Sequence, residues 1–199
     1  MPPLKTSIAL IGAGQMGKAL AQGFCNSGEC DPSGIIAYDP NQASITSLMH
    51  AIPDAKLTQT AIEATEAARY VILAVKPQHA TDVCHEIQPA IHDETIIISI
   101  IAGLPTSWLS NALQTSRVVR VMPNTPCLIG RGVSAITFPP ELKTSDVNTI
   151  QKLFTTVGVV HSVPESMLDA ITAVSGSGPG YVALLIDALA DGGVQAGLP

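Results

Sequence analysis

The chain has 199 residues, of which 46% are apolar, and its formal net charge is −6. This length and apolar content suit one α/β domain with a small appendage and argue against a disordered protein. Because no basic patch interrupts the acidic composition, we do not expect a nucleic-acid partner. No uninterrupted apolar run is long enough to cross a bilayer, and residues 1–6 do not resemble a signal peptide. We therefore expect a cytoplasmic protein without membrane contact.

The cysteines and histidines show no pattern typical of a metal site. The cysteines have no metal-ligand spacing, and no histidine has a recognisable partner. The expectation is reduced thiols and no bound metal. The cysteines are Cys25, Cys30, Cys84 and Cys127.

The first regular segment is an apolar run, Ile8–Ile11, which predicts a buried strand that starts at about Lys5. Gly12, Gly14 and Gly17 follow at the spacing G-x-G-x-x-G, and residues 15–27 read as a helix. This pattern is typical of a dinucleotide-binding turn, in which the helix N-terminus attracts a pyrophosphate. A glycine-rich turn without a ligand is the alternative.

The second strand, residues 35–39, ends in Asp39, about where a carboxylate can bind a ribose 2′-hydroxyl. Further strands are expected at 55–57, 69–75, 95–101, 117–122, 132–138 and 158–163, and helices at 41–50, 61–68, 78–88, 106–113 and 145–155. This alternation predicts an α/β fold with a Rossmann-type, doubly wound, mostly parallel sheet. Its strand ends, which meet at one crevice, include Gly12, Asp39, Val75, Lys76, Ala102 and Asn124.

The pattern changes after Pro164, so we expect one domain over 1–164 and a helical segment over 165–199. In this segment, residues 165–174 read as a helix, Ser175–Gly180 as a break, and Tyr181–Ala196 as a second helix. The second helix has an apolar stripe that two helices cannot bury by themselves. This segment therefore needs a partner, either more chain or a second subunit. The stripe consists of Val182, Leu185, Ile186 and Leu189.

Five motifs occur together in a fixed order along the chain. They are Gly12-Ala-Gly-Gln-Met16, Ala74-Val-Lys-Pro77, Met122-Pro-Asn-Thr-Pro126, Ser175-Gly-Ser-Gly-Pro-Gly-Tyr181 and Asp187-Ala-Leu-Ala-Asp-Gly-Gly193. With these motifs the chain resembles the pyrroline-5-carboxylate reductase family. The resemblance implies a Rossmann domain followed by the start of an all-helical dimerisation domain. It also implies reduction of 1-pyrroline-5-carboxylate to L-proline by NAD(P)H, the last step of proline biosynthesis, in a homodimer or higher homo-oligomer.

The resemblance also implies which residues bind the cofactor, NADPH or NADH. Asp39 departs from relatives that prefer NADPH, which often carry Ser, Asn or Arg there, since a carboxylate would repel a 2′-phosphate. The implied contacts are Gly12, Ala13, Gly14, Gln15, Met16, Gly17, Asp39, Val75, Lys76, Pro77, Ala102, Asn124 and Thr125.

A protonated cyclic imine accepts hydride readily, so the reaction requires positioning rather than a nucleophile. We assign no catalytic residue. The substrate-side candidates are Ser175, Gly176, Ser177 and Gly178, whose N–H groups suit a carboxylate; a helix-breaking hinge is the alternative. Lys76 either attracts a cofactor phosphate or the substrate carboxylate, or is simply a solvated lysine.

Two other functions stay open. A hydroxyacid dehydrogenase of related fold uses a lysine after the Rossmann domain, but no Lys or Arg follows Lys152. Alternatively, the chain is a cofactor-binding fragment without turnover. The resemblance favours this second possibility because relatives continue beyond Pro199 with helices and a Ser-Pro-Gly-Gly-Thr-Thr motif that holds the substrate carboxylate.

Overall fold

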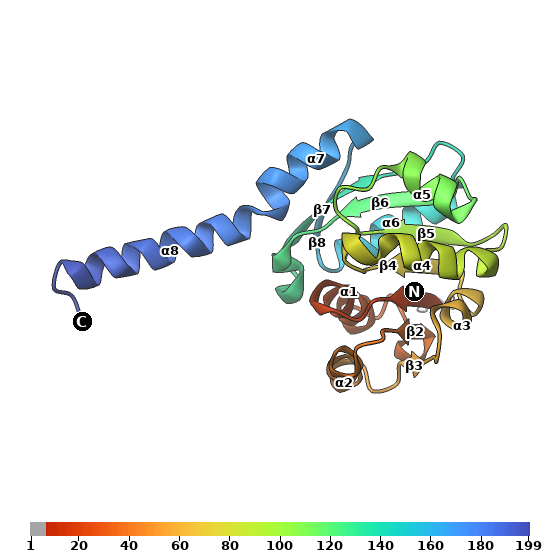
Figure 1. Cartoon of the computed structure of the whole chain (residues 1–199), viewed down its shortest axis with the longest axis horizontal. Helices are drawn as coiled ribbons and strands as arrows, with labels where there is room; N and C mark the ends of the chain where they lie inside the picture. Colours follow the sequence, from red (N-terminus) through yellow and green to blue (C-terminus); the bar gives the residue numbers. More distant parts are fainter. Residues whose placement is uncertain (1–6) are drawn as a thin grey trace.

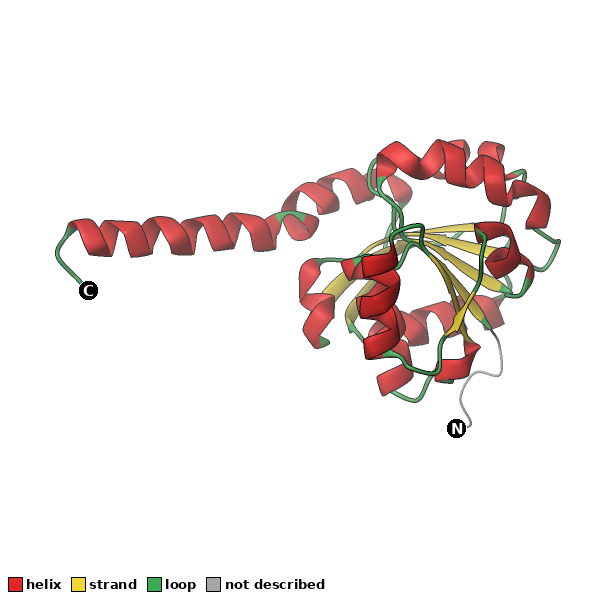
Figure 2. Ribbon diagram, turned by 60° about the horizontal axis from the view of Figure 1, so that its bottom comes forward, coloured by secondary structure: helices red, strands yellow, loops and turns green. Residues whose placement is uncertain are grey.

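The computed structural model describes residues 7–199, and its body is one eight-stranded sheet with helices on both faces (Figures 1 and 2). The strand order is β3-β2-β1-β4-β5-β6-β7-β8. The first six strands are parallel, β7 runs antiparallel to β6, and β8 is parallel to β7. This architecture confirms the predicted fold class. The strands are β1 (Ile8–Ile11), β2 (Ile35–Tyr38), β3 (Lys56–Leu57), β4 (Tyr70–Leu73), β5 (Ile96–Ser99), β6 (Val118–Met122), β7 (Gly132–Thr137) and β8 (Gly158–Ser162).

Two layers of helices bury the two faces of the sheet in separate apolar clusters. Side chains of α1, α2 and α6 form one cluster, in which Phe24 and Phe154 meet edge to face at 5.6 Å. Side chains of α3, α4 and α5 form the other. The helices are α1 (Gln15–Asn26), α2 (Gln42–Ala51), α3 (Ala61–Glu66), α4 (Ala80–Ile87), α5 (Thr106–Leu113), α6 (Thr144–Thr155), α7 (Leu168–Ile171) and α8 (Gly178–Gln195).

Most strands are shorter than predicted because their last expected residues leave the sheet. Asp39 follows β2, and Ala74 and Val75 follow β4. In the sequence these residues look like a continuation of the strand before them, but in the structure they form the loops at the crevice. Positions 5 and 6 of the expected first strand lie outside the described residues.

A buried ion cluster connects α6 to the amino ends of β4 and β6, at the end of the sheet away from the crevice. Asp146, whose side chain is 2% exposed, accepts hydrogen bonds from Arg69 Nη2 and Tyr70 Oη, both at 2.9 Å. Arg117 Nη2 lies 3.5 Å from the same carboxylate. Burial, together with the hydrogen bond to Asp146, raises the pKa of Tyr70 to about 12. Each charge in this cluster is compensated by a partner, as burial requires.

The helical segment differs from the prediction, because the glycine run does not end the helix. A 3₁₀ turn (Glu165–Met167) leads into α7, a π-helical turn follows over Thr172–Gly176, and α8 begins at Gly178. Pro179 lies in the first turn of α8, where a proline is compatible with a helix. The predicted break at Ser175–Gly180 was therefore wrong. We call the resulting helical segment, residues 165–195, the tail.

The α8 part of the tail projects from the body, and its main contacts are with the π-helical turn that precedes it (Figures 1 and 2). None of its residues is buried, and Leu184 and Leu189 are both 69% exposed. By length and composition alone, Glu165–Gln195 is long and apolar enough to cross a membrane. The continuous length of this helical segment was not expected, because the predicted break at Ser175–Gly180 divides it in two.

Candidate cofactor site

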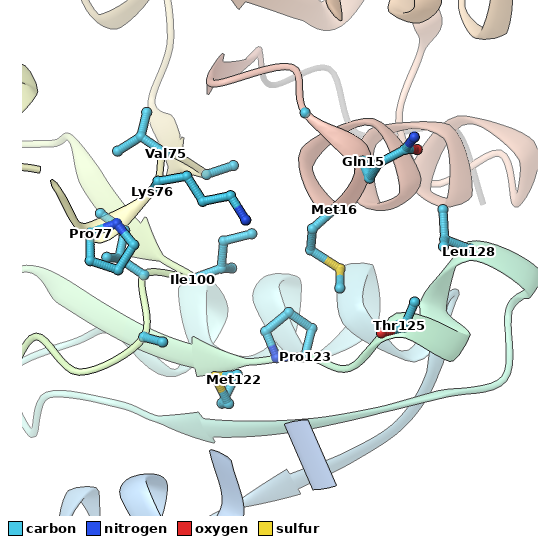
Figure 3. A pocket seen from close by; sticks show the side chains of 14 residues that line it. Gln15, Met16, Val75, Lys76, Pro77, Ile100, Met122, Pro123, Thr125 and Leu128 are labelled. Atoms are coloured by element: carbon cyan, nitrogen blue, oxygen red, sulfur yellow. The ribbon is translucent and has the colours of Figure 1, made fainter. Parts of the chain in front are cut away.

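A cavity of about 420 Å³ lies where the strand order reverses, between β1 and β4. Ligands of doubly wound sheets bind at such a switch point, outside the carboxyl ends of the strands. The wall combines the start of α1 with the ends of β4, β5 and β6 (Figure 3). The lining residues are Gly14, Gln15, Met16, Ala74, Val75, Lys76, Pro77, Ile100, Ile101, Ala102, Met122, Pro123, Thr125 and Leu128.

Each glycine of the loop between β1 and α1 has its own reason to be glycine. Gly12 has φ +99°, and a Cβ there would lie 2.8 Å from the Ala74 carbonyl oxygen. A Cβ on Gly17 would clash with the carbonyl oxygen of Gly12. Gly14 differs, because a Cβ there would meet no atom within 4 Å and would instead occupy open space beside the cavity. The first two shape the turn, and the third leaves room for a ligand.

The start of α1 suits an anionic group. The first N–H groups of an α-helix have no partner within the helix, and its dipole favours negative charge there. No acidic side chain lies in the first turn of α1. Together with the space at Gly14, this arrangement fits the pyrophosphate of a dinucleotide. Gln15 and Met16, both predicted contacts, lie in this turn and line the cavity.

Asp39 lies outside the cavity wall but holds the glycine-rich loop. Its Oδ2 accepts a hydrogen bond from Ala13 N at 2.7 Å, and its Oδ1 accepts from Asn41 N at 2.8 Å. Gly12 N donates to the carbonyl oxygen of Tyr38 at 2.9 Å. Thus Gly12, Ala13 and Gly17, all predicted contacts, do not line the cavity, and they shape the loop beside it.

The opposite wall comes from the segments after β4 and β5. Val75, Lys76 and Pro77 follow β4, and Ala102 follows β5, so all four predicted residues line the cavity. Lys76 alone is charged among the described residues of the lining. Its side chain and that of Met16 reach toward the middle of the cavity from opposite sides (Figure 3). A single cation among apolar residues suits a ligand that carries phosphate or carboxylate.

Several apolar residues of the lining were not predicted from the sequence. Ile100 and Met122 lie at the ends of β5 and β6, so the rule of strand ends identifies them once the strands are placed. Leu128 had no such signal. It lies in the 3₁₀ turn Thr125–Ile129, which packs against α1. The other missed residues are Ala74, Ile101 and Pro123.

The predicted contacts Asn124 and Thr125 have different positions, one beside the cavity and one in its wall. Thr125 lines the cavity, but Asn124 does not. The Asn124 side chain instead accepts from Val133 N at 2.8 Å and donates toward the Ser175 hydroxyl at 3.3 Å. It therefore connects the loop after β6 to the π-helical turn of the tail.

The substrate-side candidates lie behind the cavity wall rather than in it. Ser175 contacts Asn124, and a Cβ on Gly176 would lie 2.8 Å from the Met122 methyl group, which lines the cavity. Ser177 donates its hydroxyl to the carbonyl oxygen of Thr172 at 3.2 Å, and Gly178 begins α8. Among residues 7–199, no group of His, Cys, Asp and Glu side chains has an arrangement that suits a metal ion.

Comparisons with known proteins agree with this geometry. Residues 7–103 match a family model described as NADP oxidoreductase coenzyme F420-dependent, and residues 165–199 match one described as pyrroline-5-carboxylate reductase dimerisation. The pyrroline-5-carboxylate reductase of Pisum sativum is 35% identical over 100% of this chain and 73% of its own length. That of Methanosarcina acetivorans is 38% identical over 96% of this chain and 71% of its own length.

A solved structure gives the same result. The pyrroline carboxylate reductase of Plasmodium falciparum with NADP bound superposes with a TM-score of 0.86 at 30% identity, covering 99% of this chain and 72% of that one. The resemblance inferred from the five motifs is confirmed. The chain belongs to the pyrroline-5-carboxylate reductase family, whose members are NAD(P)H-dependent oxidoreductases.

Proposed function

We propose that this chain reduces 1-pyrroline-5-carboxylate to L-proline with NAD(P)H, the last step of proline biosynthesis. The observation that carries the proposal is the cavity at the switch point. It joins a glycine-rich loop that accommodates pyrophosphate to an apolar chamber beside Met122. Family membership supplies the substrate, because the relatives that match the whole chain carry that name.

The residues present fit a nicotinamide dinucleotide, which when bound supplies a hydride. Gly14 leaves the space for its pyrophosphate, and the N–H groups that begin α1 would hold it. Lys76 would neutralise part of the added negative charge. Val75, Ala102 and Thr125 would bound the nicotinamide half of the cavity, while Asp39 would face the adenosine ribose. These assignments are proposals for each residue.

The chemistry requires little from titratable side chains. A protonated imine carbon is already electrophilic, so the protein's task is to align the reactants and to exclude water. The apolar side chains of Met16, Ile100 and Met122 would both align the reactants and exclude water. The π-helical turn at Ser175 and Gly176 lies behind this wall, where Asn124 donates toward the Ser175 hydroxyl, and it does not itself line the cavity.

We further propose that the division into domains lies at Pro164, with a Rossmann domain over 1–164 and the start of a dimerisation domain over 165–199. The match of residues 165–199 to the dimerisation model supports this boundary. The apolar side chains exposed along α8 would then pack against a second copy in a symmetric dimer. A cytoplasmic location belongs to the same proposal, and the thiols of all four cysteines, which form no disulfide, are consistent with it.

The test is to mix the purified chain with NADH and 1-pyrroline-5-carboxylate and to measure L-proline by mass spectrometry. Gly14→Val, which places a branched side chain in the pyrophosphate space, is the control. Proline formed by the wild type and not by the variant supports the proposal. If NADH binds but no proline appears, the second candidate is correct: a cofactor-binding chain without turnover. The position of Ser175–Gly178 outside the cavity wall favours that candidate.

A further inference from the structure

Two cysteines lie next to each other at the end of α1. Cys25 is in the last turn of the helix, and Cys30 is in the loop that leads to β2. Between them the chain turns back at Gly28, which has φ +73° and donates its N–H to the carbonyl oxygen of Cys25 at 2.9 Å. Cys30 N then donates to the carbonyl oxygen of Phe24 at 3.0 Å. These backbone bonds hold position 30 against the last turn of α1.

The two thiols interact directly. A side-chain hydrogen bond joins their sulfur atoms, with the Cys30 thiol as donor. The same thiol lies 3.4 Å from the carbonyl oxygen of Asp31, so its proton has an acceptor also while Cys25 is neutral. Cys30 belongs to the apolar cluster of α1, α2 and α6 and is 1% exposed, whereas Cys25 is partly buried and packs against that cluster. One sulfur is therefore open to small reagents and the other is shielded behind it.

The surroundings of the pair make the two thiols unequal. The hydrogen bond from Cys30 lowers the pKa of the Cys25 thiol and outweighs burial and the negative charge of Asp31, which both act to raise it. The same hydrogen bond, together with burial, raises the pKa of Cys30. Residues 23–26 carry no basic side chain, and the helix dipole disfavours a thiolate at this end. The partner thiol is therefore what stabilises the Cys25 thiolate, as in dithiols that exchange with disulfides.

We propose that Cys25 and Cys30 form a redox-active dithiol, which low-molecular-weight disulfides such as glutathione disulfide oxidise to an intramolecular disulfide. The Cys25 thiolate first attacks one sulfur of the small disulfide, RSSR; a Cys25–S–S–R bond forms and one RS⁻ leaves. The Cys30 thiolate then attacks Cys25 Sγ, and the second RS⁻ leaves. The protein thiols lose two electrons to the small disulfide, and their two protons end on the two released RSH molecules.

The local structure favours the link within the chain over other products. The sulfur atoms are already in contact, so the bond closes over residues 26–29 without a distant partner. Glu29 in this loop forms an ion pair with Lys152 of α6 at 2.6 Å, which fixes the loop to the body. Since transient disulfides of cytosolic proteins are usually catalytic or redox-sensing, such a pair is compatible with a reducing compartment.

The site is separate from the cofactor cavity and does not depend on its ligand. Cys25 lies ten positions after Gln15 along α1, which is about 15 Å in a helix. The remaining cysteines supply internal controls. Burial raises the pKa of Cys84 to about 11 and is also the main cause of the raised pKa of Cys127. Both are buried, so neither should react in the folded protein.

The experiment treats the reduced 199-residue chain with glutathione disulfide at neutral pH. Acid stops the exchange, denaturation and iodoacetamide label the remaining thiols, and mass spectrometry maps the products. Cleavage after Glu29 separates the two cysteines, so a disulfide between them appears as a joined pair of peptides. The variants are Cys25→Ser, Cys30→Ala, which keeps the buried position apolar, and Cys84→Ala as the matched control.

Wild type should form the link between positions 25 and 30 and retain no glutathione, while Cys84 and Cys127 stay free. Cys30→Ala should retain one glutathione on Cys25, because nothing displaces it. In Cys25→Ser, reaction at Cys30 should be at least about hundredfold slower than formation of the link in wild type. Cys84→Ala should form the link at the wild-type rate.

Three results would overturn the proposal. They are wild type that keeps glutathione on Cys25 without the link, wild type whose Cys25 and Cys30 do not react, and a Cys25→Ser protein whose Cys30 reacts as fast as wild type. If Cys30→Ala does not fold, the mapping of wild type still decides whether the link forms.

Discussion

The sheet body and the α8 helix differ in the burial of their apolar residues. Every residue of β4 is buried, and the helices on both faces cover the sheet with two apolar clusters. No residue of α8 is buried, although its mean composition is more apolar than that of α1. The body is stabilised by apolar contacts within the chain. The α8 helix forms without such contacts, and its apolar side chains stay exposed. Helix formation and burial are therefore separable here.

The largest effect should come from breaking the body at its buried ion cluster. Asp146→Asn removes the charge that compensates Arg69 and Arg117. Removal of one partner from a buried ion pair costs about 3–5 kcal/mol. Urea denaturation should show a loss of this size in the free energy of unfolding. Glu94→Gln is the control, since Glu94 also pairs with Arg69 but is 64% exposed. Equal effects of the two substitutions would mean that burial does not strengthen the cluster.

The next test addresses α8, where a substitution should change association and leave the body intact. Leu185→Asp places a charge in the apolar stripe, and the proposed symmetric dimer would lose two buried leucines. At about 1.5 kcal/mol each, the dimer Kd should rise roughly hundredfold. Light scattering measures the change, and urea denaturation should find the body as stable as before. Gln195→Asp, which adds the same charge elsewhere on α8, is the control. A wild-type monomer would refute the dimer itself.

A smaller effect is expected at the cofactor loop. Gly14→Val directs a branched side chain into the space beside the cavity and should weaken both NADH and NADPH by at least about tenfold, roughly 1.4 kcal/mol. Titration of each cofactor measures this loss. Gly192→Val is the control, because a side chain there also meets open space but lies in α8. Unchanged affinity in a folded Gly14→Val protein would show that the loop is not part of the binding site.

The smallest effect concerns the joint between body and tail. Glu165 Oε1 accepts from Arg120 Nη1 at 2.8 Å and from Thr106 N at 2.5 Å. Burial acts to raise the pKa of Glu165, but these hydrogen bonds outweigh it and lower the pKa overall. The joint therefore gains stability when pH is above the pKa of an unfolded Glu, and loses it as pH falls through the folded pKa.

Limited proteolysis between α6 and α8 measures this joint across a pH series. Glu165→Gln should be cleaved faster than wild type near neutral pH, and the two should converge in acid, where the wild-type carboxyl is protonated. The difference should be modest, because this carboxylate is 36% exposed. A difference that persists in acid would assign the effect to something other than the charge.

The body was largely predictable from the sequence because its signals are local. The glycine spacing, the β-branched run at β5 and the strand–helix alternation each correspond to an element that the structure contains. Val75, Lys76 and Ala102, which line the cavity, were predicted by the rule of strand ends, and Pro77 by the family resemblance. Leu128 could not be predicted in this way, because it lies in a 3₁₀ turn, and a short turn that packs against α1 leaves no periodic pattern in the sequence.

The glycine run of the tail was misread for a related reason. Ser175–Gly180 has the composition of a helix breaker, yet the chain stays helical through it. Side chains from outside the run lie against it: Asn124 donates toward the Ser175 hydroxyl, and the Met122 methyl group fills the space where a Cβ of residue 176 would be. Such long-range contacts are invisible to reasoning from composition, and the same holds for the bonds of Asp39 to Ala13 and Asn41.

The π-helical turn also sets the rotational phase of the tail. Ser177 N donates to the carbonyl oxygen of Thr172 at 2.9 Å, five positions back, so this turn holds more residues than an α-helical turn. With 3.6 residues per turn, one added residue rotates everything that follows by about 100°. The stripe of Val182, Leu185, Ile186 and Leu189 therefore faces a direction determined at Thr172–Gly176. Deletion of one residue there would leave α8 helical and equally apolar, but aimed at a different side of the molecule.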